Sequence, residues 1–393
     1  MKRVWYVVVP LFILVGAVGV LYSQLQPALP KPTGPNIVGY QRFAVEQGER
    51  WVDLQIFYPA TAKTDQQPQA IPVELAQEFG KAYNAPTIAM QDERALPAYT
   101  DAPVANGQHP ILVFNHGHGM YATQNSHQII ELASHGYIVI ALNHPRHSLL
   151  SKNEVQTVLR GPDIADYEDD EIKTLLLRQQ RGNNELRAAN SLNEWNVAMS
   201  AIQQEAFADI VDQFPEWIEN NNLVLNALPK LQTGEIENAL AGKMDLDKIG
   251  YFGHSFGGAV ATHMGMNDER IKAAFNLDGP VFTWSLKESP TANFCFAYGD
   301  SNNQAGIPSD FSWANRQIAI ATHGCERTFK GASHMNFSDL NEIKMMKWLG
   351  QLGPIDNIAM REHLNATLLQ FFNLHLRGTG EIAKLAGTEL IQH

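Results

Sequence analysis

One serine stands between small residues at the point where an apolar segment gives way to a helical pattern. The stretch Gly253-His254-Ser255-Phe256-Gly257 has the form G-x-S-x-G, and Gly258 follows it. A tight strand-to-helix turn needs small residues around the serine, and it leaves the hydroxyl exposed at the end of the sheet. The N-terminus of the following helix favours negative charge beside it. Ser255 is therefore a candidate nucleophile, and a purely structural turn is the alternative.

A nucleophilic serine needs a base, and the base needs an acid that orients it. With this motif the order along the chain is serine, acid, histidine. The histidines that follow the candidate acids are His323, His334, His363, His375 and His393. His334 lies in the small-residue loop of "FKGASHMNFSD", directly after an apolar strand, whereas His363 and His375 fall in a helical pattern. We therefore expect His334 to be the base.

Two aspartates compete for the role of the orienting acid. Asp278 ends the apolar segment "AAFNLDG", and Asp300 ends the apolar segment "FCFAYGD". Both follow predicted strands, so both are expected at the same edge of the sheet as Ser255. Position alone does not separate them, although the strand end that carries Asp300 is used more often in folds of this kind.

The elements that must position these residues alternate between strand and helix. A short apolar strand within "HPILVFNHGHG" is followed by an amphipathic helix and by a second strand at residues 137–142. The alternation resumes at "DKIGYFGHS", and an amphipathic helix ends near Gly378. Strands separated by helices indicate a mostly parallel sheet flanked by helices, which is an α/β fold. With the serine turn, the pattern predicts an α/β-hydrolase fold.

Other segments set the expected domain organisation. We expect a Pro-rich linker at residues 27–36 and a hydrolase domain at residues 37–393, in which Trp51–Ala60 is an early strand. Residues 61–108 are polar and interrupted by prolines, which indicates a surface loop. Residues 151–230 are charged and favour helices, which predicts a helical insertion, with one long helix over 193–221.

The first 26 residues have the composition of a membrane segment. Lys2 and Arg3 precede a 19-residue, mostly apolar stretch from Val4 to Tyr22. This length suffices to span a bilayer, and the basic residues predict a cytoplasmic N-terminus. The segment is expected to be an uncleaved anchor or a removed signal peptide. Either alternative exports the rest of the chain, to the periplasmic or extracellular side.

The composition of the chain argues against some classes of binding partner. The formal net charge of −12 argues against a nucleic-acid partner, because phosphate binding needs a basic face. The six histidines at 116–147 spread over two strand ends and a helix, so we expect no metal site and no cofactor. Cys295 and Cys325 lie on or beside strands expected to be neighbours, and the chain is expected to be exported, so they are predicted to form a disulfide; two buried free thiols are the alternative.

Several segments together resemble the plasma-type, isoform II platelet-activating factor acetylhydrolases and their bacterial relatives. The resemblance covers most of residues 37–378 and rests on these motifs in order: "DLQIFYPA", "LVFNHGHG", "ELASHGYIVIALNH", "IGYFGHSFGGA", "NLDG" and "FKGASHMNFSD". In that family the acid follows the strand directly after the nucleophile helix, which implies Asp278. The resemblance also implies an oxyanion hole made by the backbone N–H groups of Phe256 and His118, with His116 and Gly117 shaping the loop.

The expected activity is hydrolysis of a small-molecule or lipid ester through an acyl-enzyme, with short or oxidised acyl esters of phospholipids implied by the family. Residues expected to line the site are Met120, Tyr121, Phe282 and Trp284. The chain departs from the family at His118 and Pro280, which leaves the acyl preference open. Alternatives are a general carboxylesterase, a polyester or cutin-type hydrolase that uses Asp300, and a catalytically silent, membrane-tethered binding module. The oligomeric state is left open.

Overall fold

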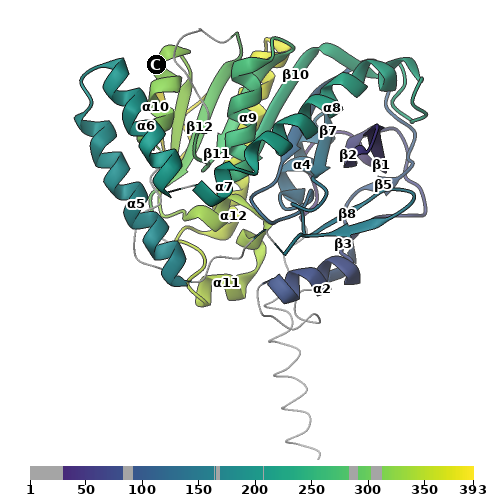
Figure 1. The fold of residues 1–393 in the computed structure, drawn as a ribbon. Coiled ribbons are helices and arrows are strands. Elements are labelled where there is room, and N and C mark those ends of the chain that lie inside the picture. The colour runs from purple at the N-terminus through teal and green to yellow at the C-terminus, as the bar shows by residue number, and fades with distance from the viewer. Residues whose placement is uncertain are drawn as a thin grey trace, which may run out of the picture.

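The structure is a computed structural model that describes residues 30–82, 92–162, 164, 169–206, 208–282, 291–301 and 312–393. Within these residues the main sheet has ten strands in the order β14-β13-β12-β11-β10-β6-β7-β2-β1-β5 (Figure 1). The strands are β1 (Ile37–Gln47), β2 (Arg50–Ala60), β5 (Tyr99–Thr100), β6 (His109–Asn115), β7 (Ile138–Asn143), β10 (Met244–His254), β11 (Ile271–Leu277), β12 (Asn293–Gly299), β13 (Cys325–Phe329) and β14 (Thr388–Gln392).

The middle of this sheet is parallel. Strands β7, β6, β10, β11, β12 and β13 pair in parallel, which places their carboxyl ends at one edge. The flanks are mostly antiparallel: β1 and β2 form a hairpin, β2 pairs with β7, and β14 pairs with β13. The expectation of an α/β-hydrolase fold with a mostly parallel sheet is confirmed. The segment predicted at Trp51–Ala60 is β2, and its hairpin partner β1 was not foreseen.

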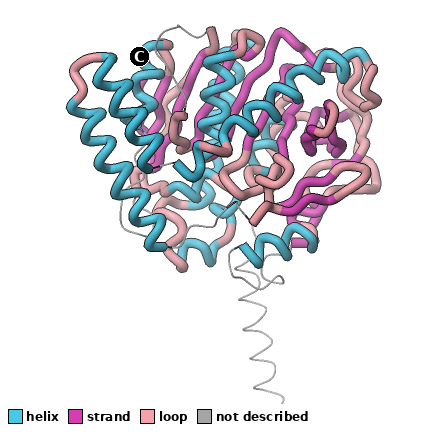
Figure 2. The backbone as a smooth tube through the Cα atoms, in the orientation of Figure 1, coloured by secondary structure: helices cyan, strands magenta, loops and turns pink. Residues whose placement is uncertain are grey.

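Helices cover both faces of the sheet (Figures 1 and 2). One face packs against α8 (Phe214–Thr233), α9 (Phe256–Asn267) and α10 (Ser312–Ala321). The other face packs against α4 (Ser126–Ser134) and α12 (Asn357–Arg377). The strands between them are apolar on both sides, as expected for a sheet buried between two helix layers.

The final helix of the domain has defined caps at both ends. At the start of α12 the Asp356 side chain accepts hydrogen bonds from the N–H groups of Ile358 and Ala359. At its end Gly378 adopts a left-handed conformation with φ of 67°, which a glycine takes at little cost. The prediction that this helix ends near Gly378 is confirmed.

Helices fill most of the region in which a helical insertion is expected, but the single helix expected over 193–221 is wrong. The chain forms α5 (Asp169–Ala188), α6 (Leu192–Ala206), α7 (Ala208–Val211) and then α8. Pro215 lies in the first turn of α8, where the missing N–H of proline is tolerated, so a new helix begins there instead of the old one continuing. Helices α5 and α6 run side by side at the edge of the molecule, whereas α8 lies on the sheet (Figure 1).

The surface loop expected over residues 61–108 is also wrong. It contains β3 (Gln69–Ile71), α2 (Val73–Ala82), β4 (Asp92–Ala95) and β5. Leu75 and Phe79 of α2 are buried against Met120 and Tyr121, and this apolar packing overrides the polar composition of the segment. A short hairpin of β8 (Leu150–Lys152) and β9 (Thr157–Leu159) begins the region expected to be helical.

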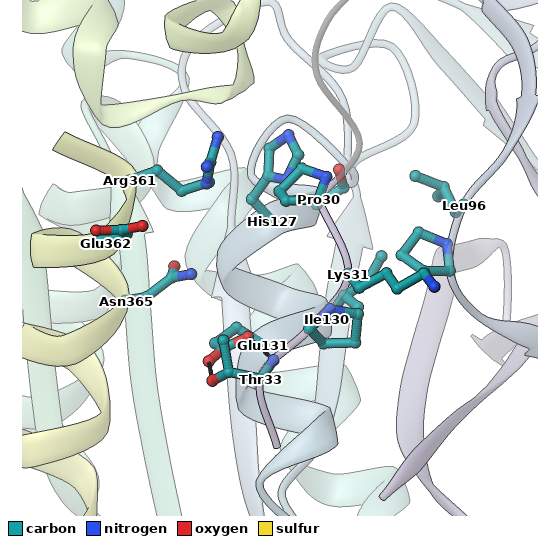
Figure 3. A pocket seen from close by; sticks show the side chains of 13 residues that line it. Pro30, Lys31, Thr33, Leu96, His127, Ile130, Glu131, Arg361, Glu362 and Asn365 are labelled. Atoms are coloured by element: carbon teal, nitrogen blue, oxygen red, sulfur yellow. Dashed lines mark hydrogen bonds between the residues drawn. The ribbon is translucent and has the colours of Figure 1, made fainter. Parts of the chain in front are cut away.

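The first described residues pack on the outer helix layer. The backbone N–H of Thr33 donates to Glu131, and that of Gly34 donates to Ser134, both on α4. A cavity of about 130 Å³ lies where Pro30–Thr33 meets α4 and α12 (Figure 3). The expected anchor or signal segment, residues 1–26, lies outside the described residues, and among the described helices none is long and apolar enough to cross a membrane.

The two cysteines are joined. Cys295 of β12 and Cys325 of β13 are register partners in neighbouring parallel strands, with Cα atoms 4.5 Å apart, and they form a disulfide. The predicted pairing is confirmed, and it closes a loop of 30 residues at the side of the sheet that carries β14.

Candidate active site

Ser255 occupies a strained turn between β10 and α9. Its φ is 57° and its ψ is −120°, which places a non-glycine residue in a sparsely populated region. Such strain costs about 1–3 kcal/mol and persists only where the surrounding structure imposes it. Here the Ser255 N–H donates to the carbonyl of Leu277 on the adjacent strand, at 2.9 Å. The turn therefore holds the serine at the carboxyl edge of the sheet, directly before a helix.

The glycines around Ser255 are required by the packing of the turn. A Cβ atom on Gly257 would lie 2.0 Å from the carbonyl oxygen of Asn115 on β6. A Cβ atom on Gly253 would lie 2.2 Å from the carbonyl oxygen of Gly257. Both distances are too short for any side chain, so the G-x-S-x-G pattern reflects close backbone contacts.

The structure brings Asp278 and His334 together. Asp278 follows β11, and its Oδ2 lies 2.7 Å from Nδ1 of His334, which begins the short helix η1 (His334–Phe337). The other carboxylate oxygen accepts a hydrogen bond from the Gly299 N–H at 3.2 Å. Asp278 is 2% exposed, and His334 is 25% exposed. A buried carboxylate on one imidazole nitrogen, with the ring open on one side, is the arrangement that orients a general base.

The serine and the histidine are held near one another by their neighbours in sequence. The imidazole of His254, the residue before Ser255, lies 4.6 Å from the imidazole of His334. Nε2 of His254 also lies 3.0 Å from the His334 carbonyl oxygen. A Cβ atom on Gly279, the residue after Asp278, would lie 2.2 Å from the Ser255 carbonyl oxygen. The turns that carry the serine, the aspartate and the histidine are thus in direct contact.

Asp300, the competing acid, has a different role in the structure. It is exposed at the end of β12, and its carboxylate accepts a hydrogen bond from the Gly331 N–H. That bond joins the end of β12 to the turn between β13 and the His334 loop. The carboxylate that meets the His334 imidazole is that of Asp278.

The expected oxyanion donors lie on segments that touch. Phe256 is the first residue of α9, so its N–H is among the four that have no partner within the helix. The ring of His118 lies 5.8 Å from the Phe256 ring, and its Nε2 lies 3.0 Å from Gln213 Oε1. The Gly117 N–H is already engaged with Gln124 at 2.6 Å. This hydrogen bond fastens the loop to Gln124.

The side chains expected to line the site fall into two apolar clusters. Phe256 and Phe282 are buried together with Phe214 of α8, with ring centroids 5.3–5.6 Å apart. Met120 and Tyr121 belong to a separate cluster beneath α2. Phe282 and Phe256 therefore pack in one apolar cluster, and Met120 and Tyr121 pack in another. Trp284 lies outside the described residues.

Three of the six clustered histidines surround a buried tryptophan. The His144 ring stacks on Trp217 of α8 at 3.8 Å, and the rings of His116 and His147 meet its edge. His116 donates from Nδ1 to the Gly117 carbonyl oxygen at 2.6 Å, and burial lowers the pKa of His116 to about 3. Burial also lowers the pKa of His144 well below its usual range. The neutral rings of His116 and His144 support the loop that carries His118.

Sequence reasoning missed the polar side chains that hold the loops in place. Gln124 bonds both Gly117 and His254, and Gln213 bonds His118 and His147. Apart from Gly117, which lies seven residues before Gln124, each partner is distant along the chain, so no local pattern pointed to it. Among the described residues, no group of three or more histidines, cysteines or acids is arranged to hold a metal ion.

The mostly parallel sheet, the strained serine between β10 and α9, and the Asp278–His334 pair define an α/β-hydrolase. The fold is similar to that of a ferulic acid esterase from Streptomyces cinnamoneus, with a TM-score of 0.62 and 18% identity over 93% of this chain and 99% of that chain. Residues 21–384 match the family model of platelet-activating factor acetylhydrolase, isoform II, so the chain belongs to that family.

Two relatives illustrate the similarity. The chain is 24% identical over 366 residues to the platelet-activating factor acetylhydrolase of the dog, Canis lupus familiaris, covering 89% of this chain and 78% of that protein. It is 26% identical over 305 residues to that of the chicken, Gallus gallus, covering 70% of this chain and 64% of that protein. Family and fold together support a hydrolase of ester bonds.

Proposed function

We propose that the chain is a serine ester hydrolase that works through an acyl-enzyme. Ser255 is the nucleophile, His334 is the general base, and Asp278 orients and stabilises the imidazole. The observation that carries this proposal is the 2.7 Å contact between Asp278 and His334 beside the strained turn of Ser255. A carboxylate on Nδ1 holds the proton there, so Nε2 is the ring nitrogen that accepts the proton of the serine hydroxyl.

In the first step the Ser255 hydroxyl oxygen attacks the ester carbonyl carbon while its proton passes to Nε2 of His334. The carbonyl oxygen becomes an oxyanion, and the N–H groups of Phe256 and His118 are the proposed donors to it. Removing one such donor typically lowers the rate by about 10²–10³-fold. The intermediate then collapses, the carbon–oxygen bond to the alcohol breaks, and the departing alkoxide takes the proton from Nε2.

In the second step water replaces the alcohol. His334 accepts a proton from a water molecule, the resulting hydroxide attacks the acyl carbon, and the bond to Ser255 breaks as the serine oxygen regains its proton. The free acid and the original enzyme result. The imidazolium that forms twice in this cycle lies against the buried Asp278 carboxylate, which stabilises it at each occurrence.

Two alternatives are less well supported. A polyester or cutin-type hydrolase that relies on Asp300 is disfavoured, because Asp300 bonds the Gly331 backbone and Asp278 occupies Nδ1 of His334. A catalytically silent binding module would have no need for the strained turn at Ser255 or for a buried acid on a histidine. Covalent reaction of Ser255 with an organophosphate separates the enzyme from the silent module.

For the substrate we propose a short-chain or oxidatively truncated acyl ester of a phospholipid, similar to platelet-activating factor. Support comes from the family and from the packing of Phe214, Phe256 and Phe282 beside the nucleophile, which leaves little room for a long acyl chain there. The test is kcat/KM on esters from acetyl to palmitoyl, with and without EDTA. The proposal expects a maximum at short chains and no effect of the chelator, and a long-chain maximum or loss of activity in EDTA contradicts it.

We also propose that residues 1–26 anchor the chain, with the catalytic domain outside the cytoplasm. The support is the apolar stretch from Val4 to Tyr22 behind Lys2 and Arg3. Pro30–Thr33 runs along α4 and shares a cavity with Ser126 and His127 of its first turn. Asp339 of the His334 loop contacts the same end of α4. Pro30, where the described chain begins, therefore lies near the catalytic edge of the sheet. Recovery of the full-length chain in the cytoplasmic soluble fraction contradicts this proposal.

A further inference from the structure

A buried amide links two catalytic loops that are far apart in sequence. Gln124 lies between the loop of His118 and helix α4, and it is 2% exposed. Its Oε1 accepts a hydrogen bond from the Gly117 N–H at 2.6 Å, and its Nε2 lies 2.8 Å from Nδ1 of His254. Nε2 of His254 lies 3.0 Å from the His334 carbonyl oxygen. The four groups form one continuous chain of hydrogen bonds.

The two backbone groups at the ends fix the direction of every bond in this chain. The Gly117 N–H can only donate, so the Gln124 atom that faces it is the oxygen. The amide nitrogen of Gln124 then donates to Nδ1 of His254, which carries no proton. The proton of the neutral ring is on Nε2, and it is donated to the His334 carbonyl oxygen, which can only accept. No other assignment pairs every donor with an acceptor.

We propose that Gln124 and His254 are positioning residues for the ester hydrolysis proposed above, and this inference rests on that proposed function. Each end of this chain of hydrogen bonds adjoins a group with a proposed chemical role. Gly117 precedes the oxyanion donor His118, and the carbonyl at the other end belongs to the base His334 itself. His254 directly precedes the nucleophile. One set of bonds thus sets the spacing between the oxyanion donor, the nucleophile and the base.

The neutral state of His254 matters as much as its position. Its ring lies 4.6 Å from the ring of His334, which becomes positively charged during the reaction. A charged His254 would repel that imidazolium, whereas a neutral ring does not. Burial, together with the nearby His334, lowers the pKa of His254 well below its usual range. The ring therefore stays neutral at the pH at which esterases work. The Gln124 amide adds to this by occupying Nδ1 with a donor.

The first test compares two buried glutamines of the same segment. Gln124→Met removes both bonds at nearly constant volume. Gln128→Met is the matched control, because Gln128 is 4% exposed and its hydrogen bonds go to Asn125 and Asn365. Neither residue belongs to the chain of hydrogen bonds described above. A misplacement of about 1 Å costs on the order of 10²-fold, so Gln124→Met should lower kcat by about 10–100-fold with KM changed by less than about 3-fold. Gln128→Met should keep kcat within about 2-fold of wild type.

A purely structural role for Gln124 predicts something else. Both variants would then lose thermal stability, and the kcat per folded molecule, counted by organophosphate titration, would match wild type. That result, or equal losses of kcat in the two variants, overturns the inference.

The second test separates the two hydrogen bonds of His254 by keeping one of them in each variant. It remains decisive if Gln124→Met does not fold. A glutamine side chain carries an amide nitrogen close to the place of Nε2 and keeps the donor to the His334 carbonyl. An asparagine side chain reaches only the place of Nδ1 and keeps the link to Gln124 alone. We expect His254→Gln to retain at least about 10-fold higher kcat than His254→Asn, because only it positions the base. Equal or reversed values overturn the inference.

The failure of this inference and the failure of the proposed function are distinguishable. If the wild-type chain hydrolyses no ester and Ser255 takes up no organophosphate, the proposed function has failed. If the wild-type chain is active and labelled but the paired variants behave alike, only the positioning role has failed.

Discussion

The replacement Asp278→Asn should nearly abolish turnover, and the structure explains why an amide of the same shape is so harmful. In the native site the Gly299 N–H donates to one carboxylate oxygen at 3.2 Å, and His334 Nδ1 lies 2.7 Å from the other. In the variant the backbone N–H still requires an acceptor, so the amide oxygen faces Gly299 and the amide NH₂ faces His334. Nδ1 then accepts a hydrogen bond, and the proton of the neutral ring moves to Nε2.

With the proton on Nε2, His334 cannot accept the proton of Ser255. An imidazole held in the wrong tautomer lowers kcat by about 10⁴-fold, which corresponds to about 5.4 kcal/mol of activation free energy. Asp300→Asn is the matched control, because the amide oxygen still accepts from the Gly331 N–H, and kcat should stay close to wild type. The assay is steady-state hydrolysis of a short-chain chromogenic ester. Near-normal turnover by Asp278→Asn, with Asp300→Asn inactive, refutes the assignment of the acid.

Two further predictions concern stability. His116 and His144 are fully buried with lowered pKa values, so they take up protons on unfolding and the unfolding free energy should fall as pH drops below 6.5. With a pKa of about 3 in the folded chain, His116 alone should contribute a loss of about 2 kcal/mol at pH 5, and His144 should add to it in the same direction; urea midpoints that do not change between pH 7 and 5 contradict this. The double change Cys295→Ser and Cys325→Ser should lower the unfolding free energy by about 3–4 kcal/mol, as the chain-entropy model gives for a 30-residue loop, and two free thiols in denatured, non-reduced wild type would reject the bridge.

The parts of the fold with strong local signals were predictable from the sequence. The apolar strand before Ser255, the glycines around it and the glycine after α12 each act over a few residues, and all three appear in the structure as expected. The β14 strand was not foreseen, because it is a short edge strand with mostly exposed side chains and no apolar alternation. The break before α8 was also missed, because the helical pattern continues on both sides of Pro215.

The residues of the candidate site also differ in whether a local sequence pattern indicates them. The G-x-S-x-G motif indicates Ser255, and the small-residue loop after an apolar strand indicates His334. The choice of Asp278 over Asp300, by contrast, came only from the resemblance to a family. Both acids end neighbouring parallel strands, and only the three-dimensional turn decides which carboxylate meets the imidazole. The contact between Gln124 and His254 spans 130 residues, so no pattern in the sequence marks it.

Reaction of the purified full-length chain with a fluorophosphonate, followed by peptide mass spectrometry, tests the central claim most directly. The account predicts one adduct, on Ser255, formed in parallel with the loss of ester hydrolysis, and it predicts neither labelling nor hydrolysis in Ser255→Ala. Hydrolysis by Ser255→Ala at the wild-type rate, or an inactivating adduct on another residue, would contradict the claim that Ser255 is the nucleophile.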